Sequence, residues 1–319
     1  MHPRLPLLDE DRRSALRLFN GFTEGYPSLV VDLFGRTLLL FTHKMNETES
    51  QGLAELTWEF YNTAMSGINC VILKQRASRD ETKKRGSVIF GADPETRILE
   101  NGVSYAVDLL MNQDAGFYLD TRNLRAWLRE HSDGKSVLNT FAYTGSLGVA
   151  SLVGGASRVT QIDRNGKFLA FARDSAGLNR FDMSKMECKG VDFFVGVGQM
   201  KRGGRTFDTV ILDPPFFSIT DRGRVDQVNE ATRLINKARP LVKDGGNLIV
   251  VNNALFLSGK EFIGALETLS DDGYLSLEEI ISVPDDVAGF PETRSGGLPA
   301  DPAPFNHSTK IAVLRVRRK

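Results

Sequence analysis

The stretch that decides the fold is residues 136–148, SVLNTFAYTGSLG, which reads as an apolar strand, a glycine-containing turn and the start of an apolar helix. A second apolar stretch, residues 158–163, closes on Asp163, 18 residues after Gly145. Such an acid at the end of the second strand holds a ribose, because its carboxylate accepts hydrogen bonds from both hydroxyls. We therefore expect a nucleoside-binding loop between the two strands.

The glycine spacing of this turn indicates which class of cofactor it can bind. In the dinucleotide pattern Gly-x-Gly-x-x-Gly the first glycine would fall on Tyr143, ahead of Gly145 and Gly148. A pyrophosphate needs close backbone approach at a helix N-terminus, which a tyrosine obstructs. A phosphate loop ending in residues 134–136 fails too, because it would need a glycine at Arg129. The turn predicts a nucleoside without phosphates, and S-adenosylmethionine is the common one.

Outward from this loop, apolar strands alternate with amphipathic helices. The predicted strands are 136–139, 158–163, 186–189, 207–212, 246–251, 275–283 and 311–317. The predicted helices are 119–131, 145–153, 166–178, 225–241 and 260–270. This pattern predicts an α/β fold with a Rossmann-like sheet, mostly parallel with the last strand antiparallel and covered by helices on both faces. Ligands of such sheets bind outside the carboxyl ends of the strands.

The N-terminal part of the chain lacks this alternation. Its pattern predicts a hairpin over 28–42, a helix over 48–64, a strand over 70–74 and a hairpin that turns at Asn101 and Gly102. We therefore expect a small α+β domain, residues 1–112, with a role in substrate recognition. Residues 113–319 form the expected cofactor-binding catalytic domain.

The fourth strand of the catalytic domain ends in residues 213–218, DPPFFS. The two prolines fix φ and remove two amide donors, so the turn offers carbonyls and a carboxylate to an incoming N–H group. The phenylalanines can stack on a planar base, and methyl transfer requires a nucleophile held in line beside the cofactor. The expected acceptor site is Asp213, Pro214, Pro215, Phe216 and Phe217. The alternative is a proline-rich turn that only closes a strand.

The third strand is followed by Asp192 and Phe193. Asp192 can accept a hydrogen bond from an adenine amino group, and Phe193 can pack on the ring. Ordinary turn chemistry is the alternative for Asp163 and Asp192, since Asp is common in turns.

Three motifs, residues 116–122, 141–145 and 213–218, resemble in order and spacing those of the class I methyltransferases that modify bacterial large-subunit (23S) ribosomal RNA. The similarity extends upstream through residues 24–32 and covers about residues 17–319. It implies S-adenosylmethionine as cofactor, S-adenosylhomocysteine as product and RNA as partner. It also implies that Phe117, Asp120 and Arg122 help to bind the cofactor. The expected cofactor-binding residues are Phe117, Asp120, Arg122, Asn139, Phe141, Tyr143, Thr144, Gly145, Asp163, Arg164, Asp192, Phe193 and Asp213.

The sequence departs from one branch of that family after the fifth strand. The branch that methylates C5 of cytosine carries a nucleophilic cysteine there, because C5 reacts only after a thiolate adds to C6. This chain has Asn252 and Asn253 instead, and neither Cys70 nor Cys188 stands in that place. The pair resembles the branch that methylates N7 of guanine, so we expect a nitrogen acceptor. Asn253 could hold a base edge or be an ordinary buried asparagine.

Fewer features of the sequence indicate RNA binding than indicate cofactor binding. Relatives usually carry an N-terminal RNA-binding domain, and because the resemblance begins at about residue 17 we expect this chain to lack it. The basic residues outside the motifs are Lys74, Arg76, Arg79, Lys83, Lys84, Arg85, Arg222, Arg224, Arg315, Arg317, Arg318 and Lys319. We expect phosphate contacts from Arg222 and Arg224 first. The remaining charges are read as solvated faces.

A stretch rich in proline and glycine, residues 283–310, lies between the last two strands. Long loops inside compact domains are usually functional lids, and a parallel preceding strand would start this one at the cofactor edge. We therefore expect substrate contacts from Phe290, Phe305, Asn306 and His307. A structural hydrogen bond is the alternative for His307.

Composition limits the function classes. The 319 residues carry 40 Lys and Arg against 40 Asp and Glu, so the whole chain is no electrostatic clamp for nucleic acid. Two separate cysteines and four scattered histidines indicate no disulfide framework or metal site. The absence of an apolar membrane span and of a signal-peptide pattern predicts a cytoplasmic protein, and a homo-oligomer stays open.

The leading hypothesis is an S-adenosylmethionine-dependent methyltransferase that modifies a base nitrogen in ribosomal or other RNA. One alternative is a methyltransferase that acts on a small molecule or a protein side chain. The second is a non-catalytic RNA-binding protein that retains the fold.

Overall fold

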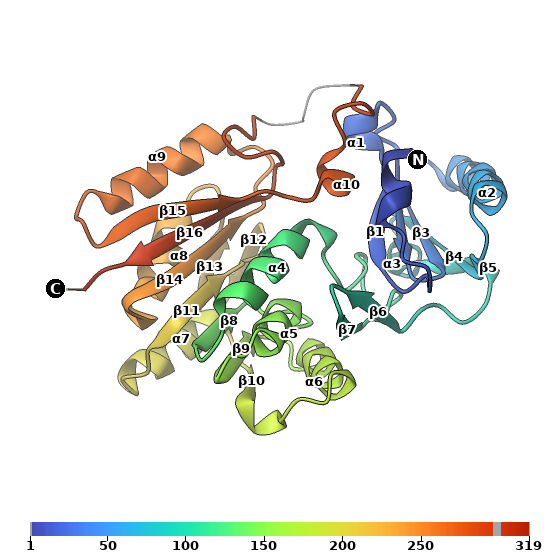
Figure 1. Cartoon of the computed structure of the whole chain (residues 1–319). Coiled ribbons are helices and arrows are strands. Elements are labelled where there is room, and N and C mark those ends of the chain that lie inside the picture. The colour runs from blue at the N-terminus through green and yellow to red at the C-terminus, as the bar shows by residue number, and fades with distance from the viewer. Residues whose placement is uncertain (1, 296–300, 319) are drawn as a thin grey trace. The chain divides into compact units, whose positions relative to one another are not determined.

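The computed structural model describes residues 2–295 and 301–318. The chain forms two compact units: Met1–Asp120 with Pro284–Gly297, and Thr121–Val283 with Leu298–Lys319 (Figure 1). The expected boundary at residue 112 thus lies eight residues before the boundary between the units, and the second unit is interrupted by a segment that belongs to the first. Lys319, one of the basic residues named above, lies outside the described residues.

The second unit is built on a seven-stranded sheet in the order β10-β9-β8-β11-β14-β16-β15. Its strands are β8 (Ser136–Thr140), β9 (Arg158–Asp163), β10 (Met186–Gly190), β11 (Phe207–Leu212), β14 (Val242–Asn252), β15 (Leu275–Ile281) and β16 (Lys310–Val316). The first five in the spatial order pair in parallel, and β16 runs antiparallel to both β14 and β15. The predicted sheet with its antiparallel last strand is confirmed.

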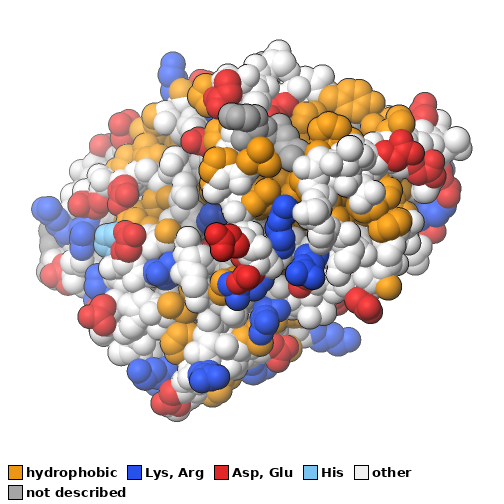
Figure 2. Space-filling model, turned by 45° about the vertical axis from the view of Figure 1, so that its right-hand side comes forward, with side chains coloured by type: hydrophobic (Ala, Val, Ile, Leu, Met, Phe, Trp, Pro, Cys, Tyr) orange, Lys and Arg blue, Asp and Glu red, His pale blue; other side chains and the backbone are white. Residues whose placement is uncertain are grey.

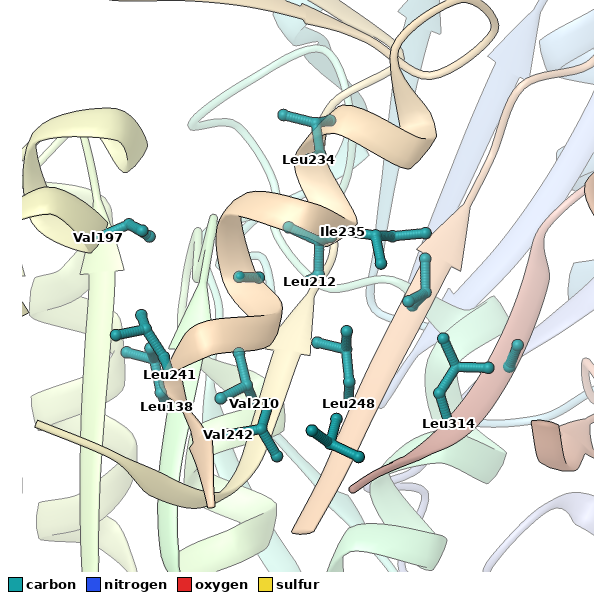
Figure 3. Packing of buried hydrophobic residues seen from close by; sticks show 14 of the residues in the cluster. Leu138, Val197, Val210, Leu212, Leu234, Ile235, Leu241, Val242, Leu248 and Leu314 are labelled. Carbon is teal, nitrogen blue, oxygen red and sulfur yellow. The ribbon is translucent and has the colours of Figure 1, made fainter. Parts of the chain in front are cut away.

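Helices cover both faces of this sheet because successive strand residues point to opposite sides. In β14, Leu248 and Val250 belong to one core cluster, whereas Ile249 and Val251 belong to the other. One face packs against α4 (Arg122–His131), α5 (Ser146–Val153) and α6 (Phe168–Leu178). The other packs against α7 (Phe193–Arg202), α8 (Ala231–Ala238) and α9 (Gly259–Ser270). Figure 3 shows Leu138, Val210 and Leu248 of the sheet beneath α8.

One predicted helix of this unit is partly wrong. The helix expected over 225–241 is preceded by a hairpin, β12 (Phe217–Thr220) and β13 (Gly223–Asp226), and only α8 and the short 3₁₀ turn η4 (Arg239–Leu241) are helical. The Asp226 carboxylate accepts hydrogen bonds from the amides of Val228 and Asn229, which fixes a turn where the apolar periodicity predicted a helix.

The first unit contains a five-stranded sheet in the order β1-β2-β3-β4-β5. Its elements are η1 (His2–Leu7), β1 (Ala15–Asn20), α1 (Gly21–Glu24), β2 (Leu29–Phe34), β3 (Thr37–Thr42), α2 (Glu47–Ala64), β4 (Cys70–Gln75), α3 (Glu81–Arg85), β5 (Ser87–Gly91), β6 (Arg97–Glu100), β7 (Val103–Ala106) and α10 (Asp285–Ala288). Helix α2 covers one face of the sheet. The hairpins predicted over 28–42 and at Asn101 and Gly102 are both present, the latter with φ of 50° and 79°.

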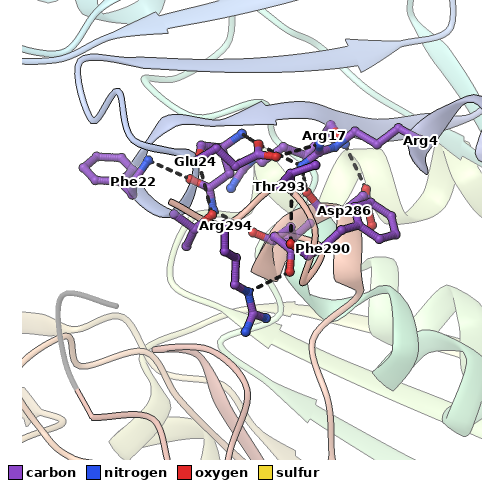
Figure 4. A network of polar contacts seen from close by, with 12 residues as sticks. Arg4, Arg17, Phe22, Glu24, Asp286, Phe290, Thr293 and Arg294 are labelled. Atoms are coloured by element: carbon purple, nitrogen blue, oxygen red, sulfur yellow. Dashed lines mark hydrogen bonds and ion pairs between the residues drawn. The ribbon is translucent and has the colours of Figure 1, made fainter. Parts of the chain in front are cut away.

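The first part of the segment expected to be a lid, Pro284–Gly297, belongs to the first unit. Arg4 forms a buried ion pair with Glu24 at 2.9 Å and donates to the Asp286 carbonyl at 3.0 Å (Figure 4). The Asp286 carboxylate in turn accepts from the Arg17 amide at 2.9 Å. Because these partners come from η1, α1 and β1, the part Pro284–Gly297 packs with this unit, whereas the chain from Leu298 onward belongs to the second unit.

Three strands of the second unit are joined at their amino ends by Asp208. Its carboxylate accepts from the Ser136 hydroxyl at 2.6 Å and from Lys243 Nζ at 2.8 Å. Burial alone would raise the pKa of Asp208, but the hydrogen bonds from Lys243 and Ser136 lower that pKa to about 2. This edge is opposite to the strand ends that carry the candidate site.

Asp208→Asn is expected to lower the free energy of unfolding by about 1 kcal/mol at pH 7, since it weakens charged hydrogen bonds. A carboxylate with a depressed pKa stabilises the fold above its ordinary pKa of about 4, and the contribution is lost as pH falls toward 2. Urea unfolding of both proteins at pH 7, 5, 4 and 3 measures this. The difference in stability should narrow only in the most acidic samples, and a constant difference would contradict the assignment.

In Figure 2, basic and acidic side chains are interspersed over the face shown. Among the described residues no helix is long and apolar enough to cross a membrane. Within the same ranges, no three His, Cys, Asp or Glu side chains come together as a metal site.

Candidate functional site

The loop after β8 has a strained backbone. Phe141 and Tyr143 have φ of 54° and 51°, a region that side-chain-bearing residues seldom adopt. The Ala142 amide donates to the Ile162 carbonyl at 2.8 Å, which holds the loop against the end of β9. Such strain persists where the surroundings enforce it, and it is concentrated at ligand sites.

Asp163 ends β9 beside this loop. Its carboxylate accepts from the Tyr143 amide at 2.9 Å and from the Asn165 amide at 2.8 Å. Burial raises the pKa of Asp163, although those amides and the Arg164 charge act against it. A carboxylate has about four lone-pair positions, and the two amides use two of them. Asp163 therefore retains acceptors for two ribose hydroxyls, which fits an adenosyl group.

Gly145 is required by packing in the protein itself. Its φ is 78°, and a Cβ there would lie 2.4 Å from Ala172 Cβ. A Cβ on Gly148 would lie 2.5 Å from the Gln161 side chain. Both glycines let α5 begin close to β9 and α6, which keeps the loop near Asp163. The glycine pattern that indicated a nucleoside therefore has a structural cause as well.

The predicted adenine contacts lie after β10. Asp192 caps α7, accepting from the Phe194 amide at 2.8 Å, and its second oxygen accepts from the Thr220 hydroxyl at 3.1 Å. The Phe193 ring is buried in the core and stacks on Phe141 with 4.6 Å between ring centroids. The half-buried Phe141 is thus the ring of this pair that can meet a ligand.

The other predicted cofactor residues of the second unit differ in exposure. Asn139 is buried and donates to Gln161 at 3.1 Å, Thr144 is buried, and Arg164 is exposed. Arg122 opens α4. Phe117 and Asp120 belong to the first unit, where the Phe117 ring is buried and packs 5.0 Å from Tyr105.

The predicted acceptor loop follows β11. Asp213 is half-buried, Pro214 is buried and Pro215 is exposed. The exposed fractions of Phe216 and Phe217 are 45% and 50%, so both rings offer a face to a partner. Aromatic side chains on a rigid loop at the carboxyl edge suit the stacking of a base.

Gln227 connects this loop to the loop after β14. Its side-chain amide donates to the Pro214 carbonyl, and its Oε1 accepts from the Asn253 amide at 2.6 Å. Its own backbone amide donates to the Phe216 carbonyl at 3.1 Å, and its carbonyl accepts from Asn252 Nδ2 at 3.0 Å. Gln227 is buried, and all four of its polar groups are used in fixing these two loops.

Gln227 was not among the predicted site residues, because it lay inside the expected helix 225–241 and carries no motif. It also changes one expectation. The carbonyls of Pro214 and Phe216, which were expected to face an incoming N–H group, accept hydrogen bonds from Gln227.

Phe256 is a second residue that sequence reasoning missed. It follows β14, and 81% of its side chain is exposed. The rule that ligands lie beyond the carboxyl ends of parallel strands could have found it. In the same loop Asn253 has a buried Oδ1 with no hydrogen-bond partner among the described residues. Gln227 links the backbone of Asn253 to the acceptor loop.

The residues that were expected to contact the substrate differ in exposure and in their partners. Arg222 and Arg224 are both exposed, and Arg224 also forms ion pairs with Asp226 at 3.3 Å and Glu230 at 3.5 Å. Phe305 was expected to touch substrate, but it is buried in the core, 5.8 Å from Phe262. His307 Nδ1 accepts from the Thr309 amide at 3.0 Å, the structural alternative named above.

The remaining expected contacts are engaged inside the protein. Asn306 pairs its side-chain amide with both backbone groups of Val283. Phe290 lies in the first unit, where Arg4 stands 5.3 Å from its ring centroid. Lys74, counted among the basic residues, is fully buried and donates to the carbonyls of Arg85 and Asn112. It is therefore unavailable to phosphate.

The chain is similar in sequence to a known protein family and to several known proteins. The sequence profile of the family described as S-adenosylmethionine-dependent methyltransferase matches residues 17–292. YwbD of Bacillus subtilis (strain 168) is 27% identical over 306 residues, which are 91% of this chain and 74% of YwbD. Ribosomal RNA large subunit methyltransferase I of Shewanella denitrificans is 30% identical over 254 residues, 77% of this chain and 62% of that protein. This chain thus spans less than two thirds of the latter relative.

Among solved structures, the crystal structure of SMU.776 complexed with S-adenosylhomocysteine has a TM-score of 0.84 and 23% sequence identity. The match covers 99% of this chain and 78% of that one. At this level of identity the likeness shows a shared fold.

Proposed function

The chain belongs to the S-adenosylmethionine-dependent methyltransferases, and from this premise we propose that it transfers the methyl group of its cofactor to a nitrogen of a base in ribosomal RNA. The names of its relatives support ribosomal RNA as the substrate class. The observation that carries the proposal is the acceptor loop at the end of β11, with exposed aromatic rings and the Asp213 carboxylate. A cytoplasmic location is part of the proposal.

The residues of the proposed site form two groups, one that binds the cofactor and one that binds the incoming base. S-adenosylmethionine supplies an electrophilic methyl group on a sulfonium. Asp163 holds the ribose through its two remaining acceptor positions, and Asp192 accepts from the adenine amino group. Asp213 accepts an N–H of the incoming base, and Phe216 or Phe217 stacks on it. The loop is rigid, so the nucleophilic nitrogen is positioned before reaction, which is the main task in an in-line displacement.

The cysteines support a nitrogen acceptor. Cys188 lies on β10, which three strands separate from β14, and Cys70 lies on β4 in the first unit. Burial raises the pKa of both thiols, which keeps them from the thiolate form that attacks C6 of a pyrimidine. A ring nitrogen carries its own lone pair and needs no such covalent activation.

The test of the proposal is methyl transfer to RNA. Full-length protein is incubated with S-adenosylmethionine labelled on the methyl group and with ribosomal RNA from cells that lack the protein. Nucleosides are then separated and analysed by mass spectrometry. The proposal predicts label on the base of one nucleoside. Cofactor binding with label recovered only in protein or small molecules would contradict the RNA assignment.

A small-molecule or protein substrate is the second candidate function, and the interspersed surface charge favours it. Salt dependence separates the two. Phosphate contacts make the affinity for RNA fall steeply as salt rises, whereas an uncharged small molecule shows little change. Absence of any cofactor binding would favour the non-catalytic alternative.

Gln227→Glu should lower kcat about tenfold while the dissociation constant of S-adenosylmethionine stays unchanged. Glutamate keeps the acceptor for the Asn253 amide but loses the donor to the Pro214 carbonyl, so the acceptor loop shifts. Single-turnover methyl transfer and calorimetric titration of the cofactor measure the two quantities. Gln199→Glu, at an exposed position of α7, is the matched control. An equal loss of cofactor affinity would contradict a positioning role.

A further inference from the structure

In the first unit, two loops meet at one edge of the sheet. Strands β3 and β4 are parallel with Thr42 opposite Gln75, so both chains leave the sheet at the same end. The Arg76 amide donates to the Thr42 carbonyl at 2.9 Å. The His43 amide donates to the Ser28 carbonyl at 2.9 Å, which brings the chain before β2 to the same edge.

Two exposed aromatic rings stand at this edge. Phe22 of α1 and Tyr26 are 42% and 45% exposed. The Phe22 ring packs edge-on against His43, with 5.0 Å between centroids. The ion pair of Glu24 with Arg4 anchors α1 from behind, and Figure 4 shows Phe22 projecting away from that network. The Phe22 ring is therefore held by His43, and both rings remain exposed.

The charges around these rings are cationic. Lys44 follows His43 and is exposed, and Arg76 is half-buried at the start of the neighbouring loop. Burial lowers the pKa of His43 to about 4, and the charges of Arg76, Arg17 and Lys44 lower it further. The imidazole is therefore neutral at physiological pH. Of these three cations, Arg17 is paired with Asp32 at 2.7 Å and Arg76 donates to the Gln113 carbonyl at 2.7 Å, whereas Lys44 is exposed.

We propose that Phe22, Tyr26, His43, Lys44 and Arg76, the aromatic-basic edge, bind a single-stranded segment of RNA. Open aromatic faces beside cations are the combination that holds single strands, since bases stack on the rings and phosphates meet the charges. The inference rests on the proposed function, because that RNA is the strand which carries the target base. It gives the first unit a substrate-binding role that the cofactor loops do not provide.

The stacking part is tested with full-length protein and a fluorescein-labelled single-stranded RNA of mixed sequence, about 12 nucleotides long. The double variant Phe22→Ala, Tyr26→Ala should raise the dissociation constant about tenfold or more. Phe60→Ala is the control, because Phe60 is an exposed aromatic residue on α2 of the same unit. Unchanged cofactor affinity in both variants shows that the fold is intact.

The charge part is tested with Lys44→Glu. Its plot of log affinity against log salt should be shallower than that of the wild type by roughly 0.7 for each phosphate contact removed. Arg36→Glu is the matched control, since Arg36 is exposed in the turn between β2 and β3, at the opposite end of the same strands. If both reversals change the slope equally, binding is non-specific and the proposal is overturned.

The outcomes separate this inference from the proposed function. If the wild type methylates RNA but the Phe22, Tyr26 double variant binds the labelled RNA normally, the aromatic-basic edge is wrong and the activity stands. If the variants weaken RNA binding but no RNA is methylated, the RNA-binding role of the aromatic-basic edge is supported and the proposed methyl transfer to RNA is contradicted. Absence of salt-dependent binding by the wild type overturns the edge directly.

Discussion

Asp213→Ala is expected to lower kcat for methyl transfer by at least about a hundredfold while the affinity for S-adenosylmethionine stays within about twofold. Removal of one preorganised group that acts on the reacting centre typically has an effect of this size. Asp213 is half-buried at the end of β11, on the loop that Gln227 fixes to the neighbouring strand. Loss of its carboxylate leaves the incoming base without its principal acceptor.

The measurement is a single-turnover transfer of labelled methyl groups to ribosomal RNA, with calorimetric titration of the cofactor. Asp221→Ala serves as the control, because Asp221 is exposed in the turn between β12 and β13 and is close in sequence. Asp213→Asn adds a finer test, since it keeps one oxygen acceptor without the charge. Full activity of Asp213→Ala would remove the acceptor-site assignment altogether.

Asp163→Ala is expected to raise the dissociation constant of S-adenosylmethionine by at least about a hundredfold. The carboxylate would accept two hydrogen bonds from the ribose, each contributing roughly 1.5–3 kcal/mol as a charged hydrogen bond, and tenfold in affinity corresponds to about 1.4 kcal/mol. The substitution also releases the amide of Tyr143, so the strained loop after β8 keeps the hydrogen bond from the Ala142 amide to the Ile162 carbonyl but loses the one to Asp163.

Folding must be separated from binding in this case. Circular dichroism and urea unfolding of Asp163→Ala show whether the second unit stays folded. Asp163→Asn retains an oxygen for one of the two amides and should lose less stability while still weakening the cofactor. Asp174→Ala, at an exposed position of α6, is the control. An unaltered dissociation constant in a folded Asp163→Ala protein would exclude Asp163 from the cofactor site.

Local signals in the sequence were sufficient where one element sets its own structure. The Asn101-Gly102 turn tolerates positive φ at both positions, and the hairpin formed as predicted. The apolar strands from residue 136 onward alternate with helices, and burial on both faces then requires a covered parallel sheet. The placement of Asp163 at the end of β9 follows from the same periodicity.

The predictions that were wrong concern residues whose structure depends on contacts between distant segments of the chain. Periodicity predicted a helix at residues 225–230, but the turn at Asp226 and the hydrogen bonds of Gln227 to two other loops are stronger than local propensity there. Composition gave no means of telling that Phe305 enters the core or that Lys74 is fully buried.

The succession of the seven strands in the second unit's sheet, the position of Asp163 beside the loop after β8, and the proline-containing turn after β11 were predictable from local sequence. Each depends on side chains that are close along the chain. The link that Gln227 makes between the loops after β11 and β14, and the packing of Pro284–Gly297 with the first unit, could be seen only in the folded chain. Hydrogen bonds and packing between segments far apart in sequence depend on where the whole chain folds, and no local pattern encodes them.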